Sequence, residues 1–273
     1  KWLILGNLRR QIMSSNYEPV KNWAKIPMGI SFYGDCGGVA VDSKDNVYVF
    51  NRGTDPICVF DPDGNFLRSF GHGEFDRPHG IEIDKEDNIY LVDDGPGNFI
   101  QKRDNNGKVI FTVGERGKEA PWQGGEMFNR PTDIAIHPTT GDLFISDGYG
   151  NSRVHKLTPE GEHILSWGVP GSENGQFSLP HNISMIGEDK VIVADRENFR
   201  LQIFDLEGNY IDQWHLHHRQ RHRPLRRQQH RLRRHRHHHH RHHQLAITAS
   251  IAISGIVGIS LGTTIIVISM VLA

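Results

Sequence analysis

His79 and His181 share one local context in the sequence. Each follows a proline and directly precedes a short run of residues typical of a β-strand. Neutral imidazoles are common zinc ligands, and an open catalytic zinc site uses three protein ligands and leaves one position free. Two such rings that point into a shared channel can therefore hold a metal ion. The alternative interpretation is that each histidine only caps the end of its strand.

Tyr149, Arg52 and Arg196 each lie just beyond a polar residue that ends a strand-like segment. Tyr149 stands between two glycines, in a turn from which its phenol can reach the mouth of a channel. A guanidinium at the position of Arg52 or Arg196 binds a carboxylate or forms a salt bridge between neighbouring repeats. For Tyr149, packing in a corner is the alternative to a chemical role.

A sequence cassette that occurs four times places these residues. Its first β-branched residue recurs at positions 39, 81, 134 and 183. The cassettes are GVAVD from Gly38, GIEID from Gly80, DIAIH from Asp133 and NISM from Asn182. A second short segment follows each cassette and ends at a polar residue. Alternation and β-branched residues predict that both segments are strands.

A third and a fourth strand complete each repeat. Glycine occupies the turn between them at positions 64, 107, 161 and 208, where a short hairpin requires a positive φ angle. Four short strands per repeat are typical of β-propeller blades, with insertions such as 118–127 in connecting loops. No helical period separates the strands, which excludes a parallel α/β fold. The sequence therefore predicts an all-β propeller with about four recognisable blades.

This pattern resembles the NHL-repeat propellers, and within them the peptidyl-α-hydroxyglycine α-amidating lyases (peptidylamidoglycolate lyases). The resemblance covers about residues 17–214. It rests on six stretches in the same order, namely NRG from Asn51, RPHG from Arg77, RPTD from Arg130, SDGYGNSR from Ser146, GQFSLPH from Gly175 and ADREN from Ala194. Members of the family are six-bladed, so the resemblance implies two blades beyond those recognised here.

The resemblance implies a zinc-dependent lyase that cleaves a carbinolamide C–N bond to give an amide and glyoxylate. His79 and His181 are then zinc ligands, Tyr149 is the base toward the substrate hydroxyl, and Arg52 is its electrostatic partner, with Arg196 near the same site. The chemistry is coherent, because zinc polarises the α-hydroxyl while a cationic arginine holds a carboxylate. The family takes its third zinc ligand from a histidine of the last blade, which this sequence does not contain.

Two further features of the family bear on this chain. The resemblance implies a structural calcium ion on the propeller axis, bound by the backbone carbonyls of Val39 and Ile81, since calcium accepts such oxygens. Animal members carry a disulfide cysteine where Gly150 stands here. That difference favours a microbial or intracellular relative over a neuropeptide-processing enzyme.

Charge is distributed unevenly along the chain. All 32 acidic residues precede Gln213 and ten of the 31 Lys and Arg residues lie in 219–241, so residues 1–214 carry −11 and the rest +10. Phosphate contacts need a positive field, so we expect no nucleic acid on the propeller. Cys36 and Cys58 permit one disulfide at most. The segment after Lys1 lacks the order of a signal peptide, and we interpret it as the start of a fragment of undetermined compartment.

The C-terminal part departs from the repeat. Residues 215–244 contain only His, Leu, Arg, Gln and Pro, the full set encoded by codons that begin with cytosine. One hypothesis is a slipped reading frame, with blades 5 and 6 in another frame of the gene. Taken literally, this segment is a polycation, and the uncharged residues 245–273 are long enough to span a bilayer as a helix. A membrane partner is expected only if that segment is genuine.

We therefore divide the chain into a lead-in (1–30), blades 1–4 (31–214), a His/Arg-rich segment (215–244) and an uncharged segment (245–273). The leading hypothesis is the metal-dependent lyase, acting on a small-molecule or peptide substrate with a carboxylate, and impaired if the third histidine is missing. The alternative is a non-catalytic propeller that binds a protein or other ligand on its channel face. A calcium-dependent hydrolase is disfavoured, because the blades offer His79 and His181 where such a site needs acidic ligands.

Overall fold

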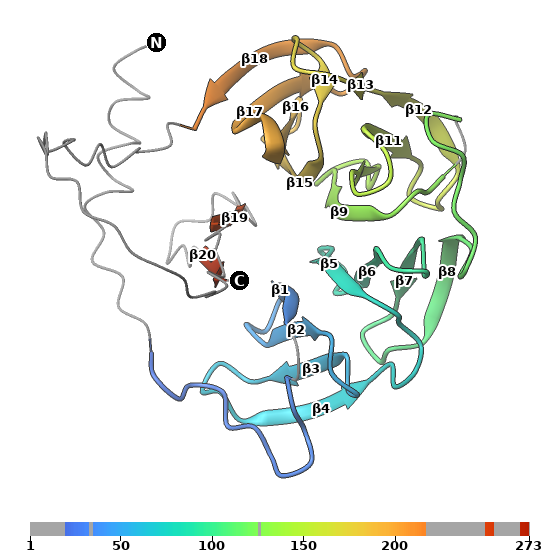
Figure 1. Ribbon diagram of the computed structural model, residues 1–273. Helices are drawn as coiled ribbons and strands as arrows, with labels where there is room; N and C mark the ends of the chain where they lie inside the picture. The colour runs from blue at the N-terminus through green and yellow to red at the C-terminus, as the bar shows by residue number, and fades with distance from the viewer. Residues whose placement is uncertain (1–19, 33–34, 125–126, 217–248, 254–267, 273) are drawn as a thin grey trace, which may run out of the picture.

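The computed structural model describes residues 20–32, 35–124, 127–216, 249–253 and 268–272. Within them lie four sheets of four antiparallel strands, each in sequential order, arranged as blades around an axis (Figure 1). The predicted all-β propeller with four recognisable blades is confirmed.

Each blade runs from an innermost strand at the axis to an outermost strand at the rim. Blade 1 contains β1 (Cys36–Val41), β2 (Val47–Asn51), β3 (Ile57–Phe60) and β4 (Phe66–Phe70). Blade 2 contains β5 (Pro78–Ile83), β6 (Ile89–Asp93), β7 (Phe99–Arg103) and β8 (Val109–Gly114). Blade 3 contains β9 (Pro131–Ile136), β10 (Leu143–Asp147), β11 (Arg153–Leu157) and β12 (His163–Trp167). Blade 4 contains β15 (Pro180–Ile186), β16 (Lys190–Asp195), β17 (Arg200–Asp205) and β18 (Tyr210–His215).

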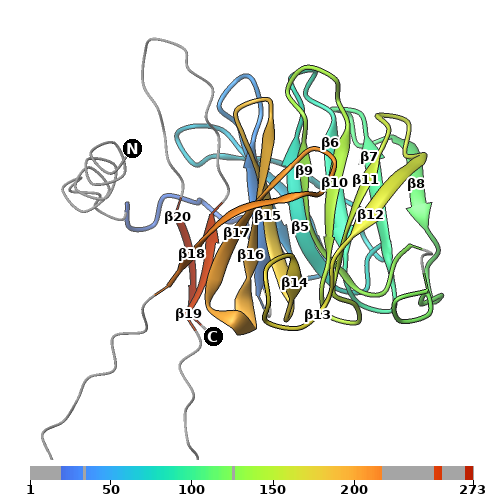
Figure 2. The same ribbon diagram turned by 90° about the horizontal axis from the view of Figure 1, so that it is seen from above.

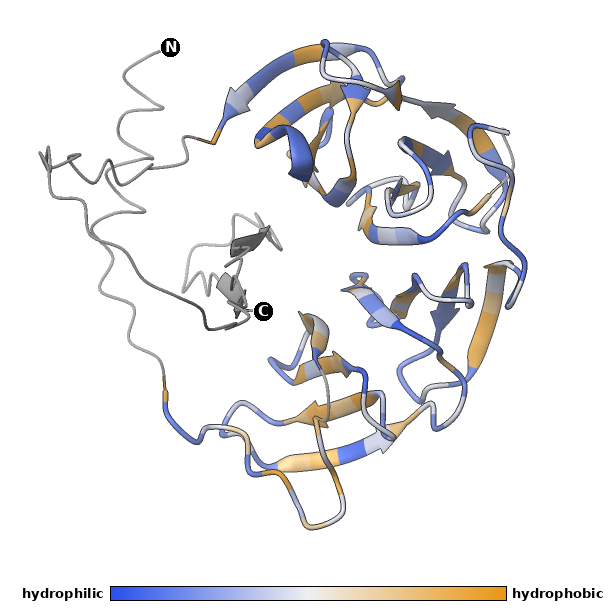
Figure 3. Cartoon of the chain, in the orientation of Figure 1, coloured by the Kyte–Doolittle hydropathy of each residue, from blue (hydrophilic) through white to orange (hydrophobic). Residues whose placement is uncertain are grey.

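The hydrophobic core lies between the blades. Three clusters of buried side chains fill the three blade junctions, and each includes a fully buried phenylalanine, namely Phe50, Phe128 and Phe177. Apolar residues concentrate on the strands, and the loops are mostly hydrophilic (Figure 3). Seen at right angles to the first view, the blades stand side by side with their loops at the two faces (Figure 2). Burial between sheets therefore fixes the loops of neighbouring blades relative to one another.

Buried polar residues at the ends of the second strands hold the loops that lead to the axis. Asn51, Asp93, Asp147 and Asp195 are all fully buried. Asp93 accepts hydrogen bonds from the backbone N–H groups of Asp76, Arg77 and Gly95, and the others bind nearby N–H groups in the same manner. These bonds satisfy backbone donors that are excluded from water. The polar corner of each repeat is thus a structural anchor for the residues around it.

The outer hairpins turn at the predicted glycines. Gly64, Gly107, Gly161 and Gly208 have φ angles of 78°, 87°, 90° and 83°. This left-handed region is favourable for glycine and costly for residues with a Cβ atom. The prediction of a positive φ angle at these four turns is confirmed.

Segments outside the blades are described in part. Trp23, in the predicted lead-in, donates a hydrogen bond to the carbonyl of Pro62 and packs on Phe60. The predicted His/Arg-rich segment lies outside the described residues from 217 onward. Of the uncharged segment 245–273, the described parts are two paired strands, β19 (Ala249–Ile253) and β20 (Ile268–Leu272), beside β1 and β15 (Figure 1). Among the residues with a described conformation, no helix is long and apolar enough to cross a membrane.

Candidate functional site

A β-bulge at the start of each innermost strand determines which residues reach the site. The strand register shifts by one residue near the beginning of β1, β5, β9 and β15, and a bulge redirects the side chain of the extra residue. The four equivalent residues are Gly37, His79, Thr132 and His181. A Cβ atom at Gly37 would overlap the carbonyl oxygens of Pro78 and His79, and Thr132 hydrogen-bonds to Ser146. Only blades 2 and 4 therefore present an imidazole at this position.

The structure brings His79, His181 and Tyr149 together from three blades. The Nε2 atom of His181 lies 3.0 Å from the Tyr149 Oη atom, and the Nε2 atom of His79 lies 3.3 Å from it. The ring centres of the two histidines are 4.8 Å apart. Both Nε2 atoms therefore face the Tyr149 Oη atom. Two nitrogen ligands of one metal ion converge in the same way.

Two glycines allow Tyr149 to occupy this position. A Cβ atom at Gly148 would overlap the carbonyl oxygen of Pro180, and one at Gly150 would overlap the side chain of Asn129. The Tyr149 N–H group also donates to the Arg130 carbonyl at 3.3 Å. The turn between β10 and β11 is thus held against both neighbouring loops, which fixes the phenol next to the imidazoles.

Hydrogen bonds assign the protons of this cluster. The Nδ1 atom of His181 lies 2.9 Å from the Asn182 Oδ1 atom, which can only accept, so Nδ1 carries the proton and Nε2 accepts from Tyr149. Burial lowers the pKa of His181 to about 4, and the nearby arginines, led by Arg196, act in the same direction. Burial and the nearby His181 hold the pKa of His79 well below its usual value. Both imidazoles are therefore neutral at pH 7, as metal ligation requires.

A buried carboxylate lies beside the imidazoles. Asp94 has a fully buried side chain whose two oxygens accept no hydrogen bond from any described residue. Its Oδ1 atom forms an ion pair with Arg77 at 3.0 Å, and its Oδ2 atom is 3.6 Å from the His79 Nε2 atom. Since His79 is neutral, this second contact is not an ion pair. Burial raises the pKa of Asp94 to about 6, against the lowering effect of Arg77 and Arg130.

Three guanidinium groups surround the Tyr149 ring. The Cζ atoms of Arg130, Arg77 and Arg196 lie 5.0, 5.1 and 5.6 Å from the ring centre. Cations at such distances are attracted to the aromatic face. Positively charged side chains therefore surround the ring that carries the phenol.

Arg52 and Arg196 occupy different surroundings. Arg52 pairs with Asp35 at 2.9 Å and donates from Nε to the Pro78 carbonyl at 3.2 Å, directly before His79. Its salt bridge lies at blade 1 and its hydrogen bond reaches blade 2, while its charge lowers the pKa of both histidines. Arg196 lies in a short 3-10 helix, η1 (Arg196–Asn198), and pairs with the adjacent Glu197 at 3.0 Å.

Residues for metal binding are present only as an incomplete set. In the part of the chain that the structure describes, no group of three or more His, Cys, Asp or Glu side chains is arranged to hold a metal ion. His79 and His181 nevertheless fit two positions of a zinc site, because both are neutral and direct Nε2 toward the Tyr149 Oη atom, beside a buried carboxylate that accepts no hydrogen bond from a described residue. Val39 and Ile81, the predicted calcium residues, lie in the adjacent strands β1 and β5. Calcium binding by their carbonyls stays a prediction.

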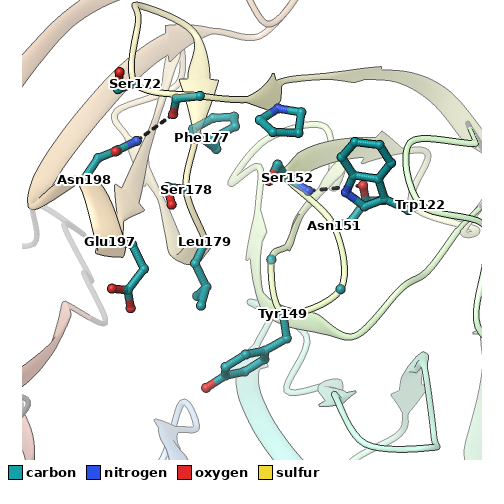
Figure 4. Close-up of a pocket in the computed structure, with 14 residues that line it drawn as sticks. Trp122, Tyr149, Asn151, Ser152, Ser172, Phe177, Ser178, Leu179, Glu197 and Asn198 are labelled. Carbon is teal, nitrogen blue, oxygen red and sulfur yellow. Dashed lines mark hydrogen bonds between the residues drawn. The ribbon is translucent and has the colours of Figure 1, made fainter.

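A pocket of about 530 Å³ opens between the loops of blades 3 and 4 (Figure 4). The Tyr149 turn forms one wall, and two segments, one before β15 with Leu179 and the other in η1 with Asn198, form the opposite wall. Trp122, from the predicted insertion, stands exposed at its edge. Two short strands, β13 (Val169–Pro170) and β14 (Gln176–Phe177), form part of its lining. The pocket therefore begins at the same turn that carries the phenol.

The neutral state of the buried imidazoles predicts a loss of stability in acid. The pKa of His181 is lowered from 6.5 to about 4. Its contribution to the free energy of unfolding is therefore complete above pH 6.5 and lost as the pH falls through about 4, a difference of about 3 kcal/mol. Asp94 acts in the opposite direction, because its raised pKa adds stability below pH 3.8 that is lost as the pH rises through about 6.

We expect the zinc-free wild type to lose about 2 to 3 kcal/mol more than a His181→Gln variant between pH 7.0 and 4.5 in urea unfolding experiments. Both proteins retain Asp94, so its contribution cancels in the comparison. Equal losses in the two proteins would show that His181 is not held neutral by the fold.

Comparisons with known proteins agree with this architecture. The family model described as "NHL repeat" matches residues 128–157, which include most of blade 3. A solved structure of streptogramin B lyase superposes with a TM-score of 0.53 at 18% sequence identity, covering 66% of this chain and 54% of that one. The chain is therefore a β-propeller whose third blade matches the NHL repeat.

Proteins with similar sequences point to a narrower group of propellers. Peptidyl-α-hydroxyglycine α-amidating lyase 1 of Drosophila melanogaster is 32% identical over 164 residues, 56% of this chain and 30% of the relative. Peptidyl-glycine α-amidating monooxygenase A of Xenopus laevis is 32% identical over 227 residues, 72% of this chain and 24% of the relative. NHL repeat-containing protein 3 of Homo sapiens is 33% identical over 204 residues, 70% of this chain and 58% of the relative. The propeller thus resembles the amidating lyases, and the chain spans about a quarter of the Xenopus protein.

Asp94, Arg77 and Arg130 are not among the site residues predicted from the sequence. Two signals for them exist in the sequence. Blade 2 ends its second strand with two aspartates where the other blades have a single acid or amide, and Arg-Pro precedes the innermost strands of blades 2 and 3. Neither signal shows that these side chains meet around Tyr149.

Proposed function

We propose that the chain is a C–N lyase for N-acylated α-hydroxyglycines, which it cleaves to an amide and glyoxylate. The observation that carries this proposal is the convergence of the His79 and His181 Nε2 atoms, from alternate blades, on the Tyr149 Oη atom at 3.3 and 3.0 Å. A resemblance to the amidating lyases supports the reaction class.

His79 and His181 would hold a zinc ion in this proposal. Bound zinc would polarise the α-hydroxyl of the substrate and lower its pKa. Both ring nitrogens are already neutral and directed to one point, so the fold supplies these ligands without rearrangement of protons. The carboxylate of Asp94, which pairs with Arg77, lies 3.6 Å from the His79 Nε2 atom and adds negative charge beside the two imidazoles.

Tyr149 moves the proton in the proposed reaction. The reaction starts from the phenolate, so the phenol proton that Tyr149 donates to His181 in the zinc-free protein would first have to leave. The phenolate oxygen then accepts the proton of the α-hydroxyl, the carbinol carbon becomes the aldehyde carbon of glyoxylate, and the C–N bond breaks. The electron pair of that bond goes to the amide nitrogen, which takes the proton back from Tyr149. No water is consumed. The cations of Arg77, Arg130 and Arg196 stabilise the phenolate during the transfer.

The pocket between blades 3 and 4 is suited to the acyl part of the substrate. It starts at the Tyr149 turn, combines the aromatic surface of Trp122 with the hydroxyl groups of Ser172 and Ser178, and is open to solvent (Figure 4). A peptide chain that extends from the scissile bond can lie there with its far end in water. The proposed substrate class is therefore an acyl or peptidyl α-hydroxyglycine.

The test is incubation of the zinc-loaded full chain with an N-acyl-α-hydroxyglycine, with glyoxylate and amide measured separately. The proposal expects equal amounts of the two products, at a rate above that of the same protein treated with chelator. Release at the chelated rate contradicts the lyase and favours a non-catalytic propeller, in which Tyr149 and the histidines only hydrogen-bond to one another.

A further inference from the structure

The four arginines of the site differ in their charge partners. Arg52 pairs with Asp35, Arg77 pairs with Asp94 and Arg196 pairs with Glu197, at 2.9 to 3.0 Å. Arg130 has no carboxylate within 4 Å in the described part of the chain. Arg130 is therefore the one arginine of these four without an ion pair among the described residues.

Only one side-chain donor of Arg130 is used within the described protein. Its Nε atom donates to the Asp94 carbonyl oxygen at 3.2 Å, and no described residue accepts a hydrogen bond from its two terminal nitrogens. Its Cζ atom is 5.0 Å from the Tyr149 ring centre, the shortest such distance among the arginines over that ring. A half-buried guanidinium with two free donors is a binding group for an oxyanion.

The backbone of Arg130 is held in a conformation that disfavours any side chain. Its φ angle is 63°, directly before Pro131. The Arg130 N–H group donates to Asn98 at 2.7 Å, and its carbonyl accepts from Tyr149 at 3.3 Å. Leu179, at the same step before Pro180 in blade 4, has a φ angle of 65°, so this conformation is shared by two blades. The position of this guanidinium relative to Tyr149 is therefore set by the backbone on both sides.

We infer that Arg130 binds the carboxylate of the substrate and determines the preference for an anion, while Arg52, Arg77 and Arg196 already form ion pairs with carboxylates of the protein. The inference deepens the proposed lyase function and rests on it. It orients the substrate across Tyr149, with the carboxylate toward the junction of blades 2 and 3 and the acyl group toward the pocket between blades 3 and 4.

The test is calorimetric binding of N-benzoylglycine, which lacks the α-hydroxyl and is not cleaved, and of its uncharged primary amide. Both are titrated into the zinc-loaded full chain. We expect the wild type to bind the carboxylate at least about tenfold more tightly than the amide. Arg130→Gln should weaken binding of the carboxylate about 10- to 100-fold and leave binding of the amide unchanged. Arg130→Lys keeps the charge but lacks the planar guanidinium group. Its affinity for the carboxylate should lie between those of the wild type and Arg130→Gln.

Arg130→Gly serves as the second variant, because glycine adopts the observed φ angle without strain and keeps the fold if glutamine does not. Arg68→Gln is the matched control, since Arg68 lies on β4 and hydrogen-bonds to Asn105 away from the site. All variants keep the basic segment 215–244, so its binding of anions cancels.

Two outcomes are distinguished. A wild type that binds carboxylate and amide equally well removes the anion site and with it the proposed substrate class. A wild type that prefers the carboxylate, together with folded Arg130 variants that keep the same preference, overturns the role of Arg130 and leaves the lyase proposal intact.

Discussion

Replacement of Tyr149 by phenylalanine is expected to lower kcat about 10²- to 10⁴-fold, with little change in zinc affinity. This range is the usual contribution of a positioned proton-transfer group. The phenol oxygen lies within 3.3 Å of both imidazoles, and three guanidinium groups surround its ring. Removal of the hydroxyl leaves the ring, the arginines and the histidines in place, so the loss should be in kcat and not in KM. The measurement is steady-state glyoxylate release by wild type and variant.

Tyr210→Phe is the matched control for this prediction. Tyr210 lies on the rim strand β18 and packs on Phe204, far along blade 4 from the axis. We expect its kcat to equal that of the wild type. A Tyr149→Phe variant that keeps kcat within threefold of the wild type would show that the phenol does not transfer the proton.

Replacement of His79 or His181 by alanine is expected to abolish high-affinity zinc binding at the site and glyoxylate release with it. Each change removes one of the two convergent Nε2 donors. Loss even of a residue that only supports a ligand costs about 10- to 100-fold in metal affinity, so loss of a ligand should exceed that range. The alternative, in which the histidines only cap strands, predicts lower stability but the same zinc affinity.

The histidines of residues 215–244 interfere with a simple measurement of bound zinc. Twelve of the 18 histidines lie in residues 215–244, so total zinc content does not report on the propeller. Competition with a chromogenic chelator should instead reveal one tight equivalent in the wild type that is missing in His79→Ala and in His181→Ala. His72→Ala is the matched control, because His72 is exposed and hydrogen-bonds only to the Thr54 carbonyl among the described residues.

The sequence alone predicted the blades because their signals are local. Each repeat alternates β-branched residues with polar ones, ends its second strand at a polar residue and turns the outer hairpin at glycine. Gly64 and its three equivalents adopt the expected positive φ angles. Equivalence between repeats also placed His79 and His181 at the same step of blades 2 and 4, because the bulge before each innermost strand is part of the repeat.

The surroundings of those histidines could not be predicted in the same way. Asp94, Arg77 and Arg130 meet because neighbouring blades pack at a fixed distance and because Arg130 adopts a φ angle of 63° that its residue type does not favour. The groups that Arg52 and Arg196 contact could not be predicted from the sequence either. Arg52 reaches Asp35 and the Pro78 carbonyl, whereas Arg196, at the same step of its repeat, pairs with its own neighbour Glu197. Such differences depend on loop conformation, which repeats do not share.

The most direct test of the account is a crystal structure of the zinc-soaked full chain with anomalous diffraction at the zinc edge. We expect an anomalous peak about 2.0 to 2.1 Å from the Nε2 atoms of both His79 and His181, next to the Tyr149 hydroxyl. A propeller with full density for both imidazoles and no anomalous peak between them, or with zinc bound only elsewhere, would contradict it.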